Sequence, residues 1–399
     1  MLSNKMNLGS VFMGLVPLFV LAHFSHHVLT ALTVPLLPFI RNDFALDYTQ
    51  SGWVVSAFSL AYGIGQLPAG WLADRAGARF VITVSISGVA LAGFLVGLSQ
   101  TFIMIIVSLA LMGLAGGGYH PAAAPLISMA VEPRNLGRTL GFHIVGGSAS
   151  YFLAPLIGVA IATVWGWRGT YIGIAVPTFF FGLLFYYVLS RIEDRERKKP
   201  ALVKHTPGEK KTSQLPWRSL VAFVVLSAFS AAIITSTIAF IPLFMVDVFG
   251  VSKKTAAAFL AIIFSAGLWA APLGGWLSDR IGRVRMVLTM SFLLGPVIYM
   301  LNLVPYGIGF GAVLLLIGMI LMMRMPVAEA FIVSHSPTHL RSTILGIYFF
   351  SAIEGGGVFT PVVGYLIDQF GFYFSFTIIG IAMVTVSFIC FPFLKGSRD

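Results

Sequence analysis

The chain has 399 residues, of which 58% are apolar and 10% charged, with a mean hydropathy of +0.93 and a formal net charge of +11. Its apolar runs are too long for the helices of a soluble domain, so the composition indicates a protein of the lipid bilayer. The single cysteine, Cys390, excludes a disulfide framework and a cysteine-based metal site. The positive charge does not indicate a nucleic-acid partner, because the basic residues fall in short loops between apolar runs.

The apolar runs predict an all-α membrane protein with twelve transmembrane helices. The first run follows a polar start and has no small-residue cleavage site, so we expect a retained helix and no cleaved signal peptide. The predicted spans cover residues 11–40, 51–73, 80–98, 101–125, 136–163, 168–190, 217–247, 255–277, 284–303, 307–332, 340–367 and 371–394.

One long polar connection, dense in Lys, Glu and Pro, separates the first six spans from the last six. We therefore expect an N-terminal six-helix bundle over 1–190, a solvated cytoplasmic linker over 191–216 and a C-terminal six-helix bundle over 217–399. A monomer is expected.

Lysine and arginine mark one side of the membrane. The even-numbered connections and both termini hold 20 of the 25 basic residues, whereas only Arg41, Arg168, Lys253 and Lys254 fall in the opposite loops. The positive-inside rule then places both termini in the cytoplasm of a multi-pass protein in the inner or plasma membrane.

A short stretch occurs twice, because GWLADRAG at 70–77 returns as GWLSDRIG at 275–282. Other residues keep the same offset of 205, among them the pairs Gly113 with Gly318 and Gly166 with Gly371. The repeat predicts two parallel halves, an arrangement in which transporters place their site near mid-membrane. The repeated positions expected to form tight gating turns are Gly70, Asp74, Arg75, Gly77, Gly275, Asp279, Arg280 and Gly282.

This stretch resembles the cytoplasmic loop signature of the major facilitator superfamily. The resemblance implies two pseudo-symmetric six-helix bundles that work by alternating access, with spans 1, 4, 7 and 10 lining the cavity. Span 5 resembles the antiporter motif of that superfamily, with small residues replacing two glycines, at positions Gly141, Ser150, Ala154, Pro155 and Gly158.

A second resemblance is to the fosmidomycin-resistance and drug:proton antiporter branch. It rests on the Gly-rich turn that ends in Tyr119-His120-Pro121 and on His143 followed by Gly146-Gly147. That branch continues after His-Pro with a Glu and an Arg, whereas this chain continues with alanines, so the resemblance does not carry over a drug specificity.

Ionisable side chains inside apolar spans are costly and are therefore candidates for function. His23 and His27 share a helical face with Thr30, whereas His26 points away. Histidines could exchange protons or could simply be neutral and hydrogen-bonded between helices. Arg324 needs a carboxylate partner or an anionic substrate, and Glu354 is the expected partner. The candidate residues for proton coupling or substrate binding are His23, His27, His120, His143, Arg324 and Glu354.

Two hypotheses follow. The first is a proton-coupled exporter of small amphipathic compounds, favoured by the antiporter-like span 5. The second is a proton-coupled importer of a small organic anion, favoured by the lone buried Arg324. No metal-ligand spacing, nucleophile motif or phosphate-binding glycine loop with a lysine appears, so an enzyme or a receptor is disfavoured. We expect no metal and no cofactor, with an ion gradient, expected to be H⁺, as the energy source.

Overall fold

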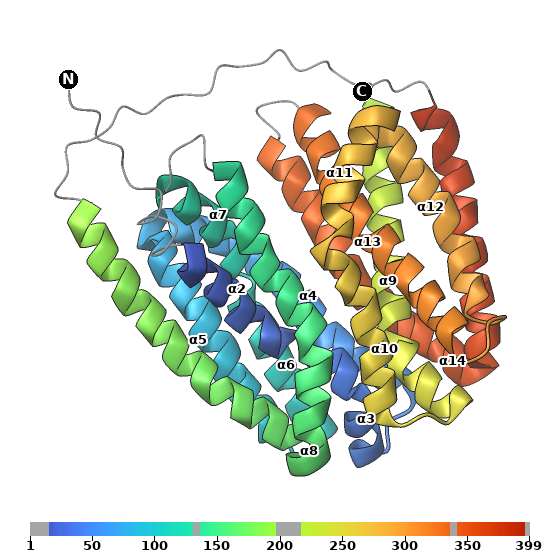
Figure 1. The fold of residues 1–399 in the computed structure, drawn as a ribbon, viewed down its shortest axis with the longest axis horizontal. Helices are drawn as coiled ribbons and strands as arrows, with labels where there is room; N and C mark the ends of the chain where they lie inside the picture. The colour runs from blue at the N-terminus through green and yellow to red at the C-terminus, as the bar shows by residue number, and fades with distance from the viewer. Residues whose placement is uncertain (1–15, 131–135, 197–216, 336–340, 396–399) are drawn as a thin grey trace. The chain divides into compact units, whose positions relative to one another are not determined.

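The computed structural model describes residues 16–130, 136–196, 217–335 and 341–395. Within these ranges the regular structure is entirely helical (Figure 1). The helices in chain order are α2 (Val16–Thr30), α3 (Thr33–Phe44), α4 (Tyr48–Ala76), α5 (Ala78–Gly97), α6 (Phe102–Gly116), α7 (Tyr119–Ala130), α8 (Leu136–Glu196), α9 (Trp217–Phe249), α10 (Lys253–Ser265), the 3₁₀ turn η2 (Ala266–Leu268), α11 (Ala270–Ile281), α12 (Arg283–Met300), α13 (Ile308–His335) and α14 (Arg341–Leu394).

These helices account for the twelve predicted spans. Eight stretches of the described chain are long and apolar enough to cross a bilayer. Two of them, His143–Arg191 and Gly356–Leu394, are each bent at one glycine and contain two spans. The predicted spans 2 and 8 correspond to α4 and to α10 with α11. The fold is therefore an all-α membrane protein of twelve transmembrane helices in two six-helix bundles.

The bends of the two longest helices lie at repeated glycines. Gly166 in α8 has φ 71° and ψ 168°, and Gly371 in α14 has φ 77° and ψ 172°. Residues with a side chain rarely adopt this backbone conformation, so only glycine turns the chain there without strain. The offset of 205 found in the sequence thus corresponds to a repeated backbone conformation.

The two copies of the repeated stretch, 70–77 and 275–282, also share one backbone conformation. Gly77 has φ 90° and ψ 137°, and Gly282 has φ 91° and ψ 141°. In each copy an arginine lies over a tryptophan ring just before this glycine: Arg75 is 4.3 Å from the Trp71 centroid and Arg280 is 3.9 Å from that of Trp276. Each copy therefore ends a helix with a cation–π pair and a glycine turn.

The chain folds into two compact units that are discontinuous in sequence. The first comprises Met1–Leu32 and Ile64–Ala201, and the second comprises Thr33–Gly63 and Leu202–Asp399. The chain passes from one unit to the other at the break between α2 and α3 and again within α4. The expected linker at 191–216 lies outside the described residues beyond Glu196, and the predicted domain boundaries stay a prediction.

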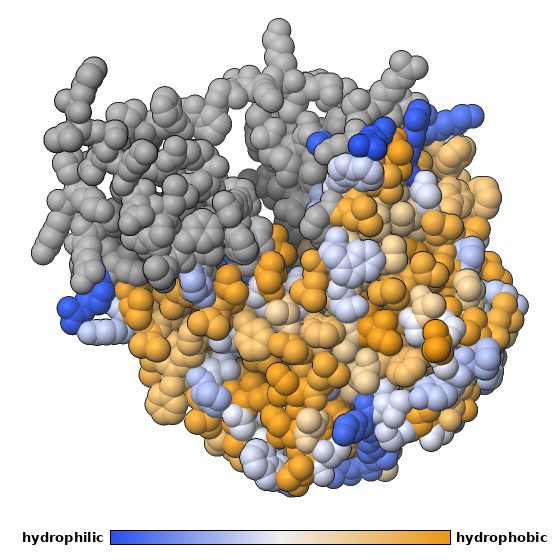
Figure 2. Space-filling model, in the orientation of Figure 1, coloured by the Kyte–Doolittle hydropathy of each residue, from blue (hydrophilic) through white to orange (hydrophobic). Residues whose placement is uncertain are grey.

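Hydrophobic side chains cover much of the molecular face that is coloured in Figure 2. Large apolar residues are strongly exposed, as with Val164 at 74% and Trp165 at 69%. A protein in water rarely exposes apolar area on this scale, whereas a bilayer stabilises it. The surface therefore agrees with the membrane location expected from composition.

The glycine turn of the repeated stretch gives a first prediction. A Cβ added at Gly77 would meet no atom within 4 Å, so Gly77→Ala adds backbone strain without a steric clash. We expect a cost of about 1–3 kcal/mol, measured as a lower apparent Tm of the purified protein. Gly275→Ala is the matched control, since its Cβ also meets open space and its backbone is helical. Equal melting of the two variants would contradict the assigned strain.

Candidate functional site

Two glycines on α8 let helix α2 approach closely within the first unit. A Cβ at Gly146 would collide with the backbone of Val20, and one at Gly147 would lie 2.7 Å from Cε1 of His23. The glycine pair is therefore required by packing: it removes the two side chains that would separate α2 from α8. The imidazole of His23 lies directly against the backbone of Gly147.

Two reciprocal hydrogen bonds join these helices. Nδ1 of His23 lies 2.8 Å from the carbonyl oxygen of His143, and Nδ1 of His143 lies 3.2 Å from the carbonyl oxygen of Phe19. A carbonyl oxygen only accepts, so both histidines carry a hydrogen on Nδ1. The two rings stack with centroids 4.2 Å apart at 17°. In its neutral form His23 consequently presents a bare Nε2.

His27 lies one turn further along α2, next to the end of that helix. Its Nδ1 is 3.2 Å from Oγ1 of Thr30, and that hydroxyl donates to the His27 carbonyl at 3.3 Å. The Thr30 oxygen therefore accepts from Nδ1, and neutral His27 also presents a bare Nε2. The helix breaks after Thr30, two residues before α3 begins, with Pro35 disfavouring its continuation.

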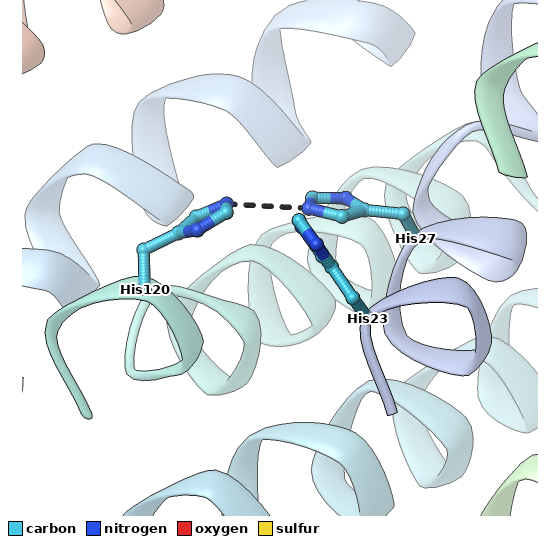
Figure 3. Close-up of side chains that lie close together, drawn as sticks. All are labelled: His23, His27 and His120. Carbon is cyan, nitrogen blue, oxygen red and sulfur yellow. Dashed lines mark hydrogen bonds between the residues drawn. The ribbon is translucent and has the colours of Figure 1, made fainter. Parts of the chain in front are cut away.

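The side chain of His120 extends from α7 toward His27 on α2. α6 ends at Gly116, and Gly117 and Gly118 separate it from α7. A Cβ at Gly118 would lie 2.6 Å from Oγ of Ser85 on α5, so this glycine also allows close packing. The exposed ring of His120 points toward His27, and their Nε2 atoms are 3.2 Å apart (Figure 3).

Four of the six predicted coupling residues are thus brought together in one unit. We call this group, with His26, the histidine cluster; its members are His23, His26, His27, His120 and His143. The ring of Tyr119 lies within the cluster, stacked on His26 at 4.5 Å and on His23 at 5.3 Å. His23, His26, His27 and His143 are buried, so α7 provides the one exposed ring of the cluster. The roles predicted for these residues stay predictions.

Arg324 lies in the second unit on α13 and is 2% exposed. Its Nη1 donates to the backbone carbonyl of Ser227 on α9 at 2.7 Å, and its Nε has no hydrogen-bond partner among the residues that the structure describes. The side chains of Glu354 and Glu329 lie outside those described. Among the described side chains, no carboxylate forms an ion pair with this guanidinium.

The predicted antiporter-like motif lies along the first part of α8. Oγ of Ser150 donates to the carbonyl of Gly147 at 2.6 Å, and Ala154 and Pro155 are buried. A Cβ at Gly158 would lie 2.6 Å from Cδ2 of Leu32. This face therefore serves close helix packing; Gly141 lies outside the described side chains, as do Gly70, Asp74 and Asp279 of the repeated stretch.

A polar cluster in the second unit was mostly missed by sequence reasoning. Asp247 forms an ion pair with Arg41 and accepts a hydrogen bond from the Tyr48 hydroxyl at 2.7 Å. Burial, and then this hydrogen bond, raises the pKa of Tyr48, so its hydroxyl stays protonated. Asp368 on α14 accepts from the backbone amides of Tyr48 at 2.9 Å and Thr49 at 2.8 Å.

These contacts make the N-terminus of α4 a capped helix end held by another helix. We call Arg41, Tyr48, Thr49, Asp247 and Asp368 the acidic clasp. The cap is completed locally by Asp47 and Gln50, which exchange side-chain to backbone hydrogen bonds of 2.6 and 3.1 Å. A carboxylate at a helix N-terminus also benefits from the helix dipole. Asp368 is some 320 positions from its partners, so no local pattern could have identified it.

The clasp gives a second prediction. Asp368→Asn removes one of two acceptor oxygens and the negative charge at the start of α4, and we expect a loss of about 1 kcal/mol, the usual net contribution of one hydrogen bond. Amide hydrogen exchange in the peptide that begins at Tyr48 should accelerate roughly fivefold. Asp47→Asn is the matched control, because Asn caps as well as Asp. Unchanged exchange in Asp368→Asn would show that the clasp does not hold α4.

With this geometry established, comparison with known proteins identifies the family. The family model described as Major Facilitator Superfamily matches residues 19–361 and 268–398. The chain is 26% identical over 356 residues to "Multidrug resistance protein MdtG" of Proteus mirabilis, covering 86% of each chain. It is also 26% identical to the "Probable L-galactonate transporter" of Escherichia coli over 60% of this chain and 55% of that protein, so this match spans about half of the relative.

A solved structure supports the fold over nearly the whole chain. A bacterial homologue of the human lysosomal transporter Spinster, in an inward-facing and occupied conformation, superimposes with a TM-score of 0.75 at 17% identity, covering 97% of this chain and 96% of the other. This likeness shows the arrangement of helices alone. With the family match over most of the sequence, it leads to one conclusion: the chain is a multi-pass membrane transporter, not an enzyme, and belongs to the Major Facilitator Superfamily.

Proposed function

We propose that this protein is a secondary active transporter that exports small amphipathic compounds in exchange for protons by alternating access. The observation that carries the proposal is the similarity to the multidrug resistance protein, which extends over 86% of both chains. The match to the sugar-acid transporter covers a smaller part of both proteins. The cell membrane as location and cytoplasmic termini belong to the same proposal, supported by the distribution of basic residues.

The composition of the chain is compatible with such substrates. It contains 35 Phe and 15 Met, residues that form adaptable apolar surfaces. An exporter of varied amphipathic compounds needs few directional contacts, because apolar burial provides most of the binding free energy. A proton gradient then supplies the energy for uphill export.

A second candidate function rests on Arg324. The guanidinium is buried and donates a hydrogen bond to a backbone carbonyl, and among the described residues its Nε has no partner. A buried cation is stabilised by an anion, and a planar guanidinium suits a carboxylate in particular. These facts favour an importer of a small organic anion symported with protons.

A third prediction separates the two functions. We would measure internal pH and labelled solute in sealed proteoliposomes of known orientation, challenged in turn with a lipophilic cation, the phosphonate fosmidomycin and a small carboxylate. For the exporter we expect protons to move opposite to the cation, with Arg324→Ala retaining at least about half of the rate because a cation gains nothing from a buried guanidinium.

The comparison with Arg324→Lys makes this test sharper, since lysine keeps the charge but loses the planar fork. Protons and the carboxylate moving together in the wild type, with loss of transport in both variants, would overturn export in favour of anion import. Each variant must first show the wild-type elution volume and apparent Tm, so that misfolding is not read as loss of function.

A further inference from the structure

Three imidazoles of the histidine cluster have the spacing of ligands around one ion. The candidate ligand nitrogens of His23, His27 and His120 all lie within 4.8 Å of one another. Their ring centroids are separated by 4.8 Å for His23 and His27, and by 5.3 Å for each of these with His120. Two nitrogens bound to one tetrahedral ion, each at about 2.0–2.1 Å, lie about 3.3 Å apart. The Nε2 atoms of His27 and His120 are 3.2 Å apart.

The hydrogen bonds on the far side of two rings favour the same conclusion. A metal-binding histidine almost always donates its other ring hydrogen to an oxygen, which fixes the tautomer and the ring plane. His23 donates from Nδ1 to the His143 carbonyl, and His27 donates from Nδ1 to Thr30. Both therefore keep Nε2 free of a hydrogen, and Figure 3 shows the rings of His23 and His27 on α2 lying close to that of His120 on α7.

The unprotonated nitrogens of these rings lie close together. The bare Nε2 of His27 faces the Nε2 of His120 at 3.2 Å. A single hydrogen on His120 would satisfy one of the two nitrogens, but would leave the Nε2 of His23 out of the interaction. A cation between the rings accepts all three lone pairs. Since the three rings come from only two helices of one unit, binding requires small ring rotations and no rearrangement between units.

We propose that His23, His27 and His120 form a binding site for one divalent first-row transition-metal ion, with water completing a tetrahedral coordination. Three imidazoles suit Zn²⁺, Ni²⁺, Co²⁺ or Cu²⁺ and do not suit Mg²⁺ or Ca²⁺, which need oxygen ligands. His120 is the exposed member of the three. The sequence shows no ligand spacing that would indicate this site, because His120 is 93 positions from His27.

The test is Zn²⁺ binding to the full chain, purified without a polyhistidine tag and treated with a chelator. Titration calorimetry should give one Zn²⁺ per chain for the wild type. His27→Gln and His120→Gln should each weaken binding by at least about tenfold, and Thr30→Val, which removes only the oxygen that orients His27, by about tenfold. His26→Gln is the matched control on the same helix and should bind as the wild type does, since its ring is outside the triad.

Cobalt gives a second readout that reports geometry and not affinity alone. Co²⁺ bound by the wild type should show the intense visible absorption of a tetrahedral site, retained in His26→Gln and absent in His27→Gln. No Zn²⁺ binding by the correctly folded wild type would overturn the proposal, as would equal binding by His27→Gln or equal loss in His26→Gln. The proposal goes beyond the transport function and holds or fails independently of which solute is moved.

Discussion

The structure depends on one constraint: a polar side chain inside an apolar helix must find its partner within the protein, because the bilayer offers none. The first unit meets this constraint by pairing helices α2 and α8 through His23, His143 and the backbone carbonyls that accept their Nδ1 hydrogens. The glycine pair at 146 and 147 brings the backbones close enough for those bonds. Packing and hydrogen bonding are thus parts of a single arrangement.

The second unit pairs charges at a helix end, where the side chains of Arg41 and Asp247 are partly exposed. At the start of α4, carboxylates satisfy helix amides and an arginine, so every charge of the acidic clasp has an opposite charge or a donor. Arg324, by contrast, is a buried cation whose acceptor among the described residues is the neutral carbonyl of Ser227. A fully satisfied group stabilises the fold, whereas a partly satisfied one is available to a ligand. The contrast explains why Arg324 and not Arg41 is the candidate for anion binding.

Much of the fold could be predicted from the sequence, because length and hydrophobicity alone define a transmembrane helix. The repeated glycines Gly77, Gly166, Gly282 and Gly371 were visible as a spacing, and the structure shows that each has a positive φ. The break between α2 and α3 and the 3₁₀ turn η2 were not predicted, because both lie inside continuous apolar runs that were each assigned to a single span.

The sequence was enough to select the residues of the candidate site, but not to predict how those residues are arranged. His23, His27, His120 and His143 were selected because ionisable groups are rare in such helices. Their tautomers follow from the carbonyl of a residue 120 positions away and from the Thr30 hydroxyl, and only the folded helices show these contacts. A metal site was not expected, because its third ligand joins the pair on α2 only when α7 packs against them.

The measurement that tests the central claim most directly is the ring tautomer of His23 and His27 in the folded protein. Nitrogen NMR of histidine-labelled protein, assigned with His23→Gln and His27→Gln, distinguishes a hydrogen on Nδ1 from one on Nε2. We predict Nδ1–H for both residues, with their Nε2 signals shifting when Zn²⁺ is added. An Nε2–H tautomer at His23 or His27, unchanged by Zn²⁺, would contradict this prediction.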